Sequence, residues 1–158
     1  NTALAYAKEG GSITILNPAP AQPLGENILR LCDFVTPNEI EAEQITGIPV
    51  KTISDAEVAA DKLLEKGASA AVITLGEQGA LFKDSKQIIH QPSFQVGPIV
   101  ETTGAGDAFN GGLAVALAEE MPIDKALRFA CATASISVTR PGTAPSMPDR
   151  NEIDTLLT

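Results

Sequence analysis

The residues best suited to chemistry lie in one short segment, ETTGAGDAFNGG at positions 101–112. Gly104 and Gly106 can adopt backbone angles that are closed to other residues, and the alanine-rich run after them predicts a helix. The unpaired N–H groups of its first turn, together with the positive end of the helix dipole, would form an anion site. Asp107 places a carboxylate beside that site. The segment therefore indicates deprotonation of a group while negative charge builds on a phosphoryl group.

Two common phosphate-binding motifs fail on spacing in this segment. The P-loop pattern needs a lysine after its second glycine, but Gly111 is followed by Gly112 and Leu113. The dinucleotide-binding fingerprint needs its third glycine two residues before Gly111. A glycine-rich loop that only packs a helix against a strand is the structural alternative.

Composition excludes several classes of partner. The chain has 158 residues, enough for one sizeable core, and 44% of them are apolar. A net charge of −9 argues against nucleic acid or an anionic membrane as a partner.

No apolar run approaches the length of a membrane span, and the spacing of Cys32 and Cys131 matches no metal or redox motif. We therefore expect a cytoplasmic protein with reduced thiols. Because the chain begins without Met, in what reads as helix interior, we also expect a fragment of a longer protein.

Predicted strands and helices alternate along the chain. The apolar runs predict strands at 12–16, 34–36 and 70–75, and a hairpin from 80–82 and 87–91. Helices are predicted at 2–9, 24–31, 39–46, 54–66, 104–119 and 123–139, and from Pro148 to Leu157. This alternation favours one α/β domain over residues 1–158, with a mainly parallel sheet covered on both faces. Ligands bind beyond the carboxyl ends of strands in such sheets, where residues 38, 74–79 and 104–107 are expected.

Capping residues mark two of these helix starts. Asn38 is a favourable N-cap for the helix at 39–46. Ser54 and Glu57 match the capping-box spacing, so we expect them to open the next helix.

Several segments together, in order along nearly the whole chain, resemble the ribokinase-like sugar kinases of the PfkB carbohydrate kinase family. They are NPAP at 17–20, TPNExEA at 36–42, ITLGxxG at 73–79, TTGAGDxFxG at 102–111 and the tail VTRxGxxPS at 138–146. The resemblance implies a three-layer α/β/α fold with a mainly parallel central sheet. It also implies that this chain is the carboxyl-terminal portion, without the N-terminal half and its small β lid.

The resemblance further implies transfer of a phosphoryl group from ATP to a sugar hydroxyl, with D-ribose as the first candidate and ribose 5-phosphate as the product. Asp107 matches the catalytic base that contacts the sugar. The N–H groups of Gly104, Ala105 and Gly106 would neutralise charge on the transferred group.

Other matching positions would hold the nucleotide and its metal. Asn38 and Glu41 match a motif that organises Mg²⁺ and phosphate through water, and helix capping is their structural alternative. Positions expected along ATP are Thr74, Gly76, Glu77, Gln78 and Gly79, together with Gly106 and Asp107 of the segment described first. Cys131 falls at a position near adenine, and its alternative interpretation, which we favour, is a small core residue.

A monovalent cation site is implied as well. The matching positions, several through backbone carbonyls, are Glu101, Thr103, Ser137, Arg140, Gly142 and Ser146. Glu101 stands where the family usually has an aspartate, so its side chain is one methylene longer. Hard-cation sites depend on cavity size and ligand reach. We therefore expect K⁺ to bind, less tightly.

The family's di-glycine sugar motif and most of its sugar contacts have no counterpart here. We therefore expect the isolated chain to be inactive, and the parent protein to be a homodimer that uses ATP and a small sugar. One alternative is a kinase of the same family for deoxyribose, fructose or a nucleoside. Another is a non-catalytic nucleotide-binding module. A dehydrogenase is disfavoured by the failed dinucleotide spacing.

Overall fold

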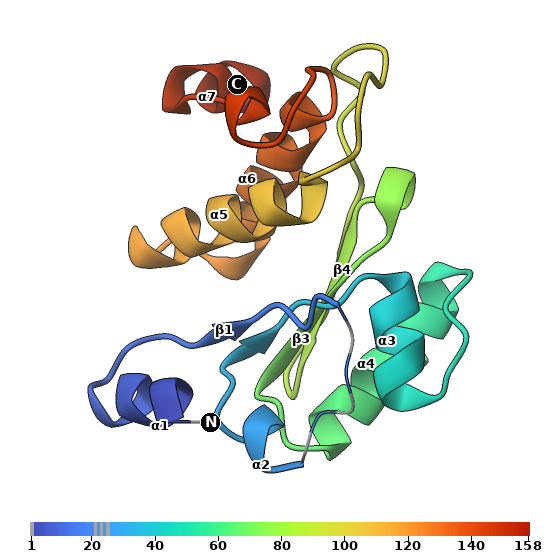
Figure 1. Ribbon diagram of the computed structural model, residues 1–158, viewed down its shortest axis with the longest axis vertical. Coiled ribbons are helices and arrows are strands. Elements are labelled where there is room, and N and C mark those ends of the chain that lie inside the picture. The colour runs from blue at the N-terminus through green and yellow to red at the C-terminus, as the bar shows by residue number, and fades with distance from the viewer. Residues whose placement is uncertain (1, 21, 23, 25) are drawn as a thin grey trace. The chain divides into compact units, whose positions relative to one another are not determined.

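The chain folds into two compact units, which we describe separately. The computed structural model describes residues 2–20, 22, 24 and 26–158 (Figure 1). The first unit comprises Asn1–Leu75 and Leu81–His90, and the second comprises Gly76–Ala80 and Gln91–Thr158. A single domain over residues 1–158 stays a prediction.

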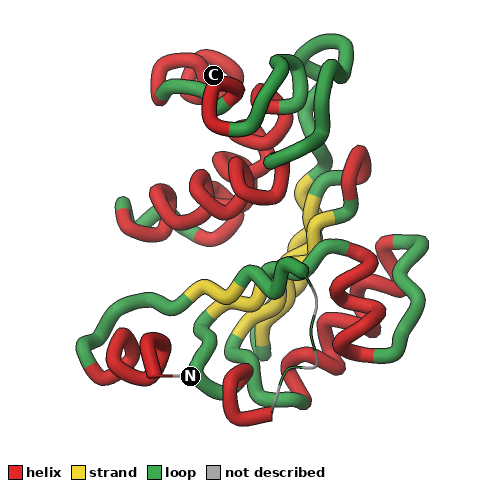
Figure 2. Tube along the Cα trace, viewed as in Figure 1, coloured by secondary structure: helices red, strands yellow, loops and turns green. Residues whose placement is uncertain are grey.

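The first unit contains most of a five-stranded sheet, drawn in yellow in Figure 2. Strand β1 (Ile15–Leu16) pairs in parallel with β2 (Phe34–Val35), and β2 pairs in parallel with β3 (Ala70–Thr74). Strands β4 (Ala80–Asp84) and β5 (Ile88–Gln91) complete the order β1-β2-β3-β4-β5. A tight turn joins β4 to β5, in which the Asp84 N–H donates to the Gln87 carbonyl at 3.1 Å. The predicted parallel pairing and the predicted hairpin are both confirmed.

Strand β1 is shorter than the predicted run at 12–16, although the Thr14 carbonyl still accepts the Phe34 N–H of β2 at 2.9 Å. The Thr14 N–H donates to Asp33 Oδ2 at 2.9 Å, and the Thr14 hydroxyl donates to the Leu31 carbonyl at 2.7 Å. The Thr14 N–H is thus paired with a side chain and not with a strand.

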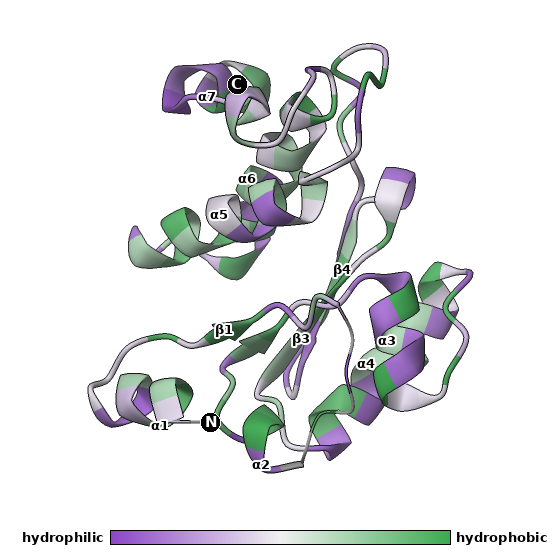
Figure 3. Cartoon of the chain, in the orientation of Figure 1, coloured by the Kyte–Doolittle hydropathy of each residue, from purple (hydrophilic) through white to green (hydrophobic). Residues whose placement is uncertain are grey.

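Helices α1 (Thr2–Glu9), α2 (Glu26–Leu29), α3 (Glu39–Thr46) and α4 (Ile53–Glu65) complete the first unit. Figure 3 shows hydrophobic residues along β1 and β3, and both hydrophobic and hydrophilic residues on α3 and α4, as expected for helices that cover a sheet. The core of this unit includes Val35, Leu63, Ile73 and Leu81, all fully buried.

The predicted capping box at Ser54 and Glu57 is wrong by two residues. Helix α4 begins after Thr52, whose Oγ1 accepts the Asp55 N–H at 3.1 Å, while Asp55 Oδ2 accepts the Thr52 N–H at 2.9 Å. Asp55 also accepts the Lys51 N–H at 3.1 Å. One carboxylate therefore satisfies two orphan backbone donors ahead of the helix, which favours the earlier start.

The second unit is mainly helical. Helices α5 (Ala105–Ala118) and α6 (Ile123–Ser137) pack side by side (Figure 1), and α7 (Arg150–Leu157) contacts α6. A Cβ added at Gly112 would lie 2.7 Å from Thr133 Oγ1 and 3.1 Å from Ala130 Cα, so glycine permits the close approach of α5 to α6. Two short 3₁₀ helices, Gly76–Gln78 and Ala144–Ser146, belong to the same unit. Within the part of the chain that the structure describes, no helix has the length and hydropathy needed to cross a membrane.

Candidate active site

Residues 104–107, which we name the anion turn, form the start of α5. Gly104 is the N-cap residue, with φ of 83° in the left-handed region, a conformation that glycine adopts without strain. The Ala105 N–H donates to the Thr102 carbonyl at 3.1 Å. The N–H groups of Gly106 and Asp107 lie in the first turn, where an α-helix supplies no intrahelical acceptor. Of the three predicted anion donors, the N–H of Ala105 is thus already hydrogen bonded within the protein. It lies between the N–H groups of Gly104 and Gly106.

Asp107 lies in the same first turn and is exposed. Its carboxylate is therefore accessible to a ligand, and it shares the first turn with the N–H groups of Gly106 and Asp107. The Asn110 side chain donates from Nδ2 to the Gly106 carbonyl at 2.8 Å, which ties the anion turn to the next turn of α5.

The loop at 140–146 packs against the anion turn. A Cβ added at Gly104 would lie 3.2 Å from both Cβ and Cγ2 of Thr143. Oε2 of Glu101 accepts the Gly142 N–H at 2.8 Å. The hydrogen bond from Gly142, and a second from the Thr103 hydroxyl, stabilise the carboxylate and lower the pKa of Glu101. The structure thus brings Glu101, Thr103 and Gly142 together.

The remaining predicted cation ligands lie on the same loop and the end of α6. Ser146 is 1% exposed, and its hydroxyl donates to the Thr143 carbonyl at 2.7 Å. The Ser137 carbonyl accepts the Arg140 N–H at 3.3 Å. The Arg140 guanidinium forms an ion pair with Glu152 on α7, so only its backbone is a candidate ligand. All donors in this set are oxygens, which suits a hard cation.

Asn38, Glu41 and Thr74 lie together in the first unit. Asn38 Oδ1 accepts the Glu41 N–H and Glu41 Oε2 accepts the Asn38 N–H, each at 2.9 Å, which completes a capping box. Thr74 pairs with Asn38 in an isolated parallel bridge, and its N–H donates to the Pro37 carbonyl at 3.0 Å. Glu41 is 8% exposed. The capping role of both residues is confirmed, and their contact with Mg²⁺ and phosphate stays a prediction.

Residues 76–79, the nucleotide loop, form a 3₁₀ turn in the second unit. The Gly79 N–H donates to the Gly76 carbonyl at 3.1 Å, and the Glu77 carbonyl accepts the Ser93 hydroxyl at 2.6 Å. Gly79 has φ of 92°, and a Cβ added there would lie 2.0 Å from the Gln91 carbonyl oxygen. Only glycine fits this position. The sequence did not predict that Gln91 and Ser93 contact the nucleotide loop, because these contacts join two separate segments of the chain.

Cys131 meets the same carbonyl. Its thiol donates to the Gln91 carbonyl oxygen, with Sγ and oxygen 3.8 Å apart, and it is 3% exposed. Burial raises the pKa of the Cys131 thiol to about 12, so the group is neutral. The interpretation of Cys131 as a core residue is confirmed, and its contact with adenine stays a prediction.

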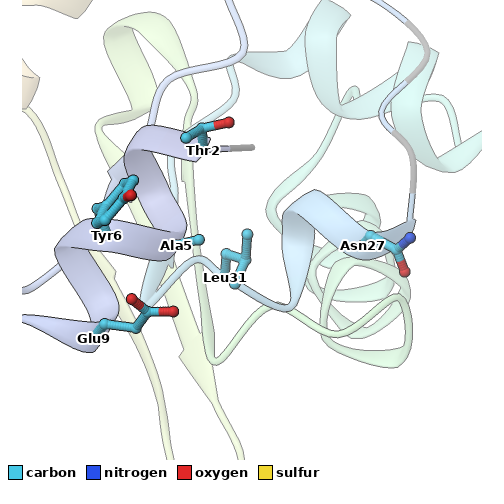
Figure 4. Close-up of a pocket in the computed structure, with 6 residues that line it drawn as sticks. All are labelled: Thr2, Ala5, Tyr6, Glu9, Asn27 and Leu31. Atoms are coloured by element: carbon cyan, nitrogen blue, oxygen red, sulfur yellow. The ribbon is translucent and has the colours of Figure 1, made fainter.

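A pocket of about 560 Å³ lies at α1 and α2 (Figure 4). It is lined by Thr2, Ala5, Tyr6, Glu9, Asn27 and Leu31. Tyr6 is 72% exposed at its rim. This lining includes none of the residues that the sequence predicts to bind ATP, a sugar or a cation.

Comparisons with known proteins agree with the resemblance found in the sequence. Residues 1–150 match a family described as pfkB family carbohydrate kinase. A ribokinase of Haemophilus influenzae is 45% identical over 148 residues, which cover 92% of this chain and 47% of the relative. A deoxyribokinase of Salmonella typhi is 38% identical over 156 residues, which cover 98% of this chain and 51% of the relative. The chain thus spans about half the length of the curated relatives that it matches.

Solved structures give the same result. The chain matches Arabidopsis thaliana ribokinase in complex with ribose and ATP with a TM-score of 0.94 and 33% identity, over 98% of this chain and 50% of that one. It matches a Thermotoga maritima ribokinase with a TM-score of 0.87 and 40% identity, over 99% and 52%. The predicted ribokinase-like α/β fold is therefore confirmed.

Proposed function

Because the chain belongs to the pfkB family of carbohydrate kinases, we propose that it supplies the nucleotide-binding part and the catalytic base for phosphoryl transfer from ATP to a sugar hydroxyl. The observation that carries this proposal is the start of α5. There an exposed carboxylate, Asp107, shares one helical turn with outward-facing backbone N–H groups. D-ribose is the proposed acceptor and ribose 5-phosphate the product, supported by the ribokinases among the relatives.

In the proposed reaction, Asp107 accepts the proton of the sugar hydroxyl as that oxygen bonds to the γ-phosphorus of ATP. The bond between the γ-phosphorus and the bridging oxygen breaks, and ADP leaves with the electron pair. The N–H groups of the anion turn then oppose the charge on the equatorial oxygens of the transferred group. Positioning and electrostatics supply most of the rate in such transfers, so Asp107 need not be a strong base.

The nucleotide and its metal are assigned to the positions that match the family. Glu41 would act on Mg²⁺ through water. One of its carboxylate oxygens already accepts the Asn38 N–H, so a metal-bound water would use the other. When bound, Mg²⁺ would neutralise charge on the phosphates of ATP. The remaining proposed contacts with ATP are made by Asn38, Thr74, Gly76, Glu77, Gln78, Gly79 and Cys131.

K⁺ is the proposed monovalent cation at the loop formed by residues 140–146. The oxygen donors of Glu101, Thr103, Ser137, Arg140, Gly142 and Ser146 fit its chemistry. We propose that Glu101 binds it less tightly than an aspartate would, because its Oε2 already accepts the Gly142 N–H. Phosphoryl transfer that responds no differently to K⁺ than to Na⁺ or choline would contradict this part of the proposal.

Two other functions are open to the same site. The Salmonella typhi deoxyribokinase, which matches over 98% of this chain, favours deoxyribose as the second acceptor to test. Measuring phosphoryl transfer to ribose, deoxyribose, fructose and a nucleoside would show which of these acceptors the kinase uses. A non-catalytic nucleotide-binding module is disfavoured by the exposed Asp107, since binding alone requires no base beside the anion turn.

The first test is binding and turnover by the 158-residue chain, with Asp107→Asn as its partner variant. We propose that the chain binds Mg·ATP, measured by calorimetry, and that it forms little ADP with ribose because it spans about half of its relatives. The assembly of the active protein as a homodimer in the cytoplasm stays a prediction. A folded chain with no affinity for Mg·ATP would contradict the proposed function.

A further inference from the structure

Asn110 acts on the peptide group that carries one of the anion-turn donors. Its side-chain Nδ2 donates to the Gly106 carbonyl oxygen at 2.8 Å. That carbonyl and the N–H of Asp107 belong to the same planar peptide group, so a hydrogen bond to one end polarises the other. The Asp107 N–H lies in the first turn of α5 and points out of the helix start. The Asn110 amide therefore strengthens a donor that faces the proposed phosphoryl group.

Packing does little to hold this peptide group. A Cβ added at Gly106 would have no atom within 4 Å, and both Gly106 and Asp107 are exposed. The orientation of the peptide group between residues 106 and 107 therefore depends on the helix itself and on the Asn110 side chain. An asparagine inside a helix has lower intrinsic helix propensity than alanine, so it is not explained by the needs of the helix alone.

We propose that Asn110 is a positioning residue that orients and polarises the peptide between Gly106 and Asp107 for binding of the transferred phosphoryl group. The inference rests on the proposed function. It assigns Asn110 no contact with ATP or the sugar, and it predicts that loss of the amide weakens the donor without weakening the fold.

The test uses the ¹⁵N-labelled 158-residue chain and its Asn110→Ala variant, titrated with Mg·ATP. We expect the backbone amide proton of Asp107 to move upfield in the free variant, because the Asn110 side chain no longer donates to the Gly106 carbonyl of the same peptide group. We expect affinity for Mg·ATP to fall about three- to tenfold, the effect of one hydrogen bond. The melting temperature should stay constant or rise, because alanine favours the helix.

Two further variants separate positioning from a general effect. Asn110→Ser keeps a hydroxyl that can donate to the carbonyl four residues earlier, as Thr155 does to Asn151 at 2.7 Å, so it should restore part of the Asp107 shift and of the affinity. Thr155→Ala removes the bond from Thr155 to Asn151 in α7, and it should leave the Asp107 amide shift and the affinity for Mg·ATP unchanged. It is the matched control.

The outcomes distinguish this role from the proposed function. If the folded wild-type chain does not respond to Mg·ATP, the proposed function fails and this role fails with it. If the wild-type chain binds normally but Asn110→Ala leaves the Asp107 shift and the affinity unchanged, the positioning role alone is overturned. If Asn110→Ala loses affinity only together with a fall in melting temperature, and Asn110→Ser does not recover it, Asn110 is structural and the proposal is wrong.

Discussion

Replacing Gly106 by alanine should stabilise the protein and weaken ATP binding at once. Gly106 is helical, and a Cβ there would meet no atom within 4 Å, so the fold has room for it. Alanine is favoured over glycine in a helix by about 0.5–1 kcal/mol. For a chain of this size that gain raises the melting temperature by about 1–4 °C. The empty space beside Gly106 is where the phosphoryl group should approach the backbone, so the added methyl group should reduce affinity for Mg·ATP at least about tenfold, a loss of about 1.4 kcal/mol.

Two other glycines provide matched controls. Gly111 also lies in α5 with no atom within 4 Å of a built Cβ, so Gly111→Ala should raise the melting temperature by a similar amount and leave ATP binding unchanged. Gly104 has φ of 83°, and its built Cβ would lie 3.2 Å from Thr143. Gly104→Ala should therefore lose about 1–2 kcal/mol from the left-handed conformation alone, which lowers the melting temperature by about 2–8 °C.

Thermal denaturation followed by circular dichroism, with calorimetric titration of Mg·ATP, measures both effects on each variant. If Gly106→Ala binds Mg·ATP as tightly as the wild type, the phosphoryl group does not approach the backbone beside Gly106. If Gly106→Ala melts at a lower temperature than the wild type, the fold has no room for a Cβ at this position.

Other predictions concern caps, acid stability and thiol reactivity. Thr52→Ala should lower the free energy of unfolding by about 1 kcal/mol in urea, whereas Ser54→Ala should change it by less than about 0.5 kcal/mol, because only Thr52 caps α4. Hydrogen bonds lower the pKa of Glu101, so the ionised side chain stabilises the fold above the ordinary pKa of 4.5, and this stabilisation is lost as the pH falls through the lowered pKa. The melting temperature of Glu101→Gln should therefore fall less at acid pH than that of the wild type. Burial raises the pKa of Cys131 to about 12, so iodoacetamide at neutral pH should modify it only after unfolding, as mass spectrometry of the peptides would show.

Local signals predicted the elements well, because caps and glycines act over a few residues. The N-cap at Asn38 and the start of α5 after Gly104 both follow from adjacent residues. The start of α4 was misplaced because Thr52 with Asp55 and Ser54 with Glu57 have the same spacing, and only the hydrogen bonds of Asp55 distinguish them.

Contacts between distant segments could not be predicted from the residues alone. Glu101 accepts the Gly142 N–H from a loop at the far end of α6, and Gly79 fits against the carbonyl of Gln91. Neither pair has a local pattern, although the resemblance to the family had already grouped Glu101 with Gly142. The hydrogen bond from Asn110 was missed for another reason, since an asparagine at that spacing also reads as an ordinary exposed helix residue.

The central claim is that Asp107 accepts the proton of a sugar hydroxyl during phosphoryl transfer from ATP. The most direct measurement is formation of ribose 5-phosphate and ADP by a chimera that joins this chain to the part of the Haemophilus influenzae ribokinase that it does not match. We predict equal amounts of the two products, and a loss of about 100-fold or more in turnover, with ATP binding retained, when Asp107→Asn is introduced. A folded Asp107→Asn chimera with undiminished turnover would contradict the claim, as would a chimera that binds ATP and ribose without forming either product.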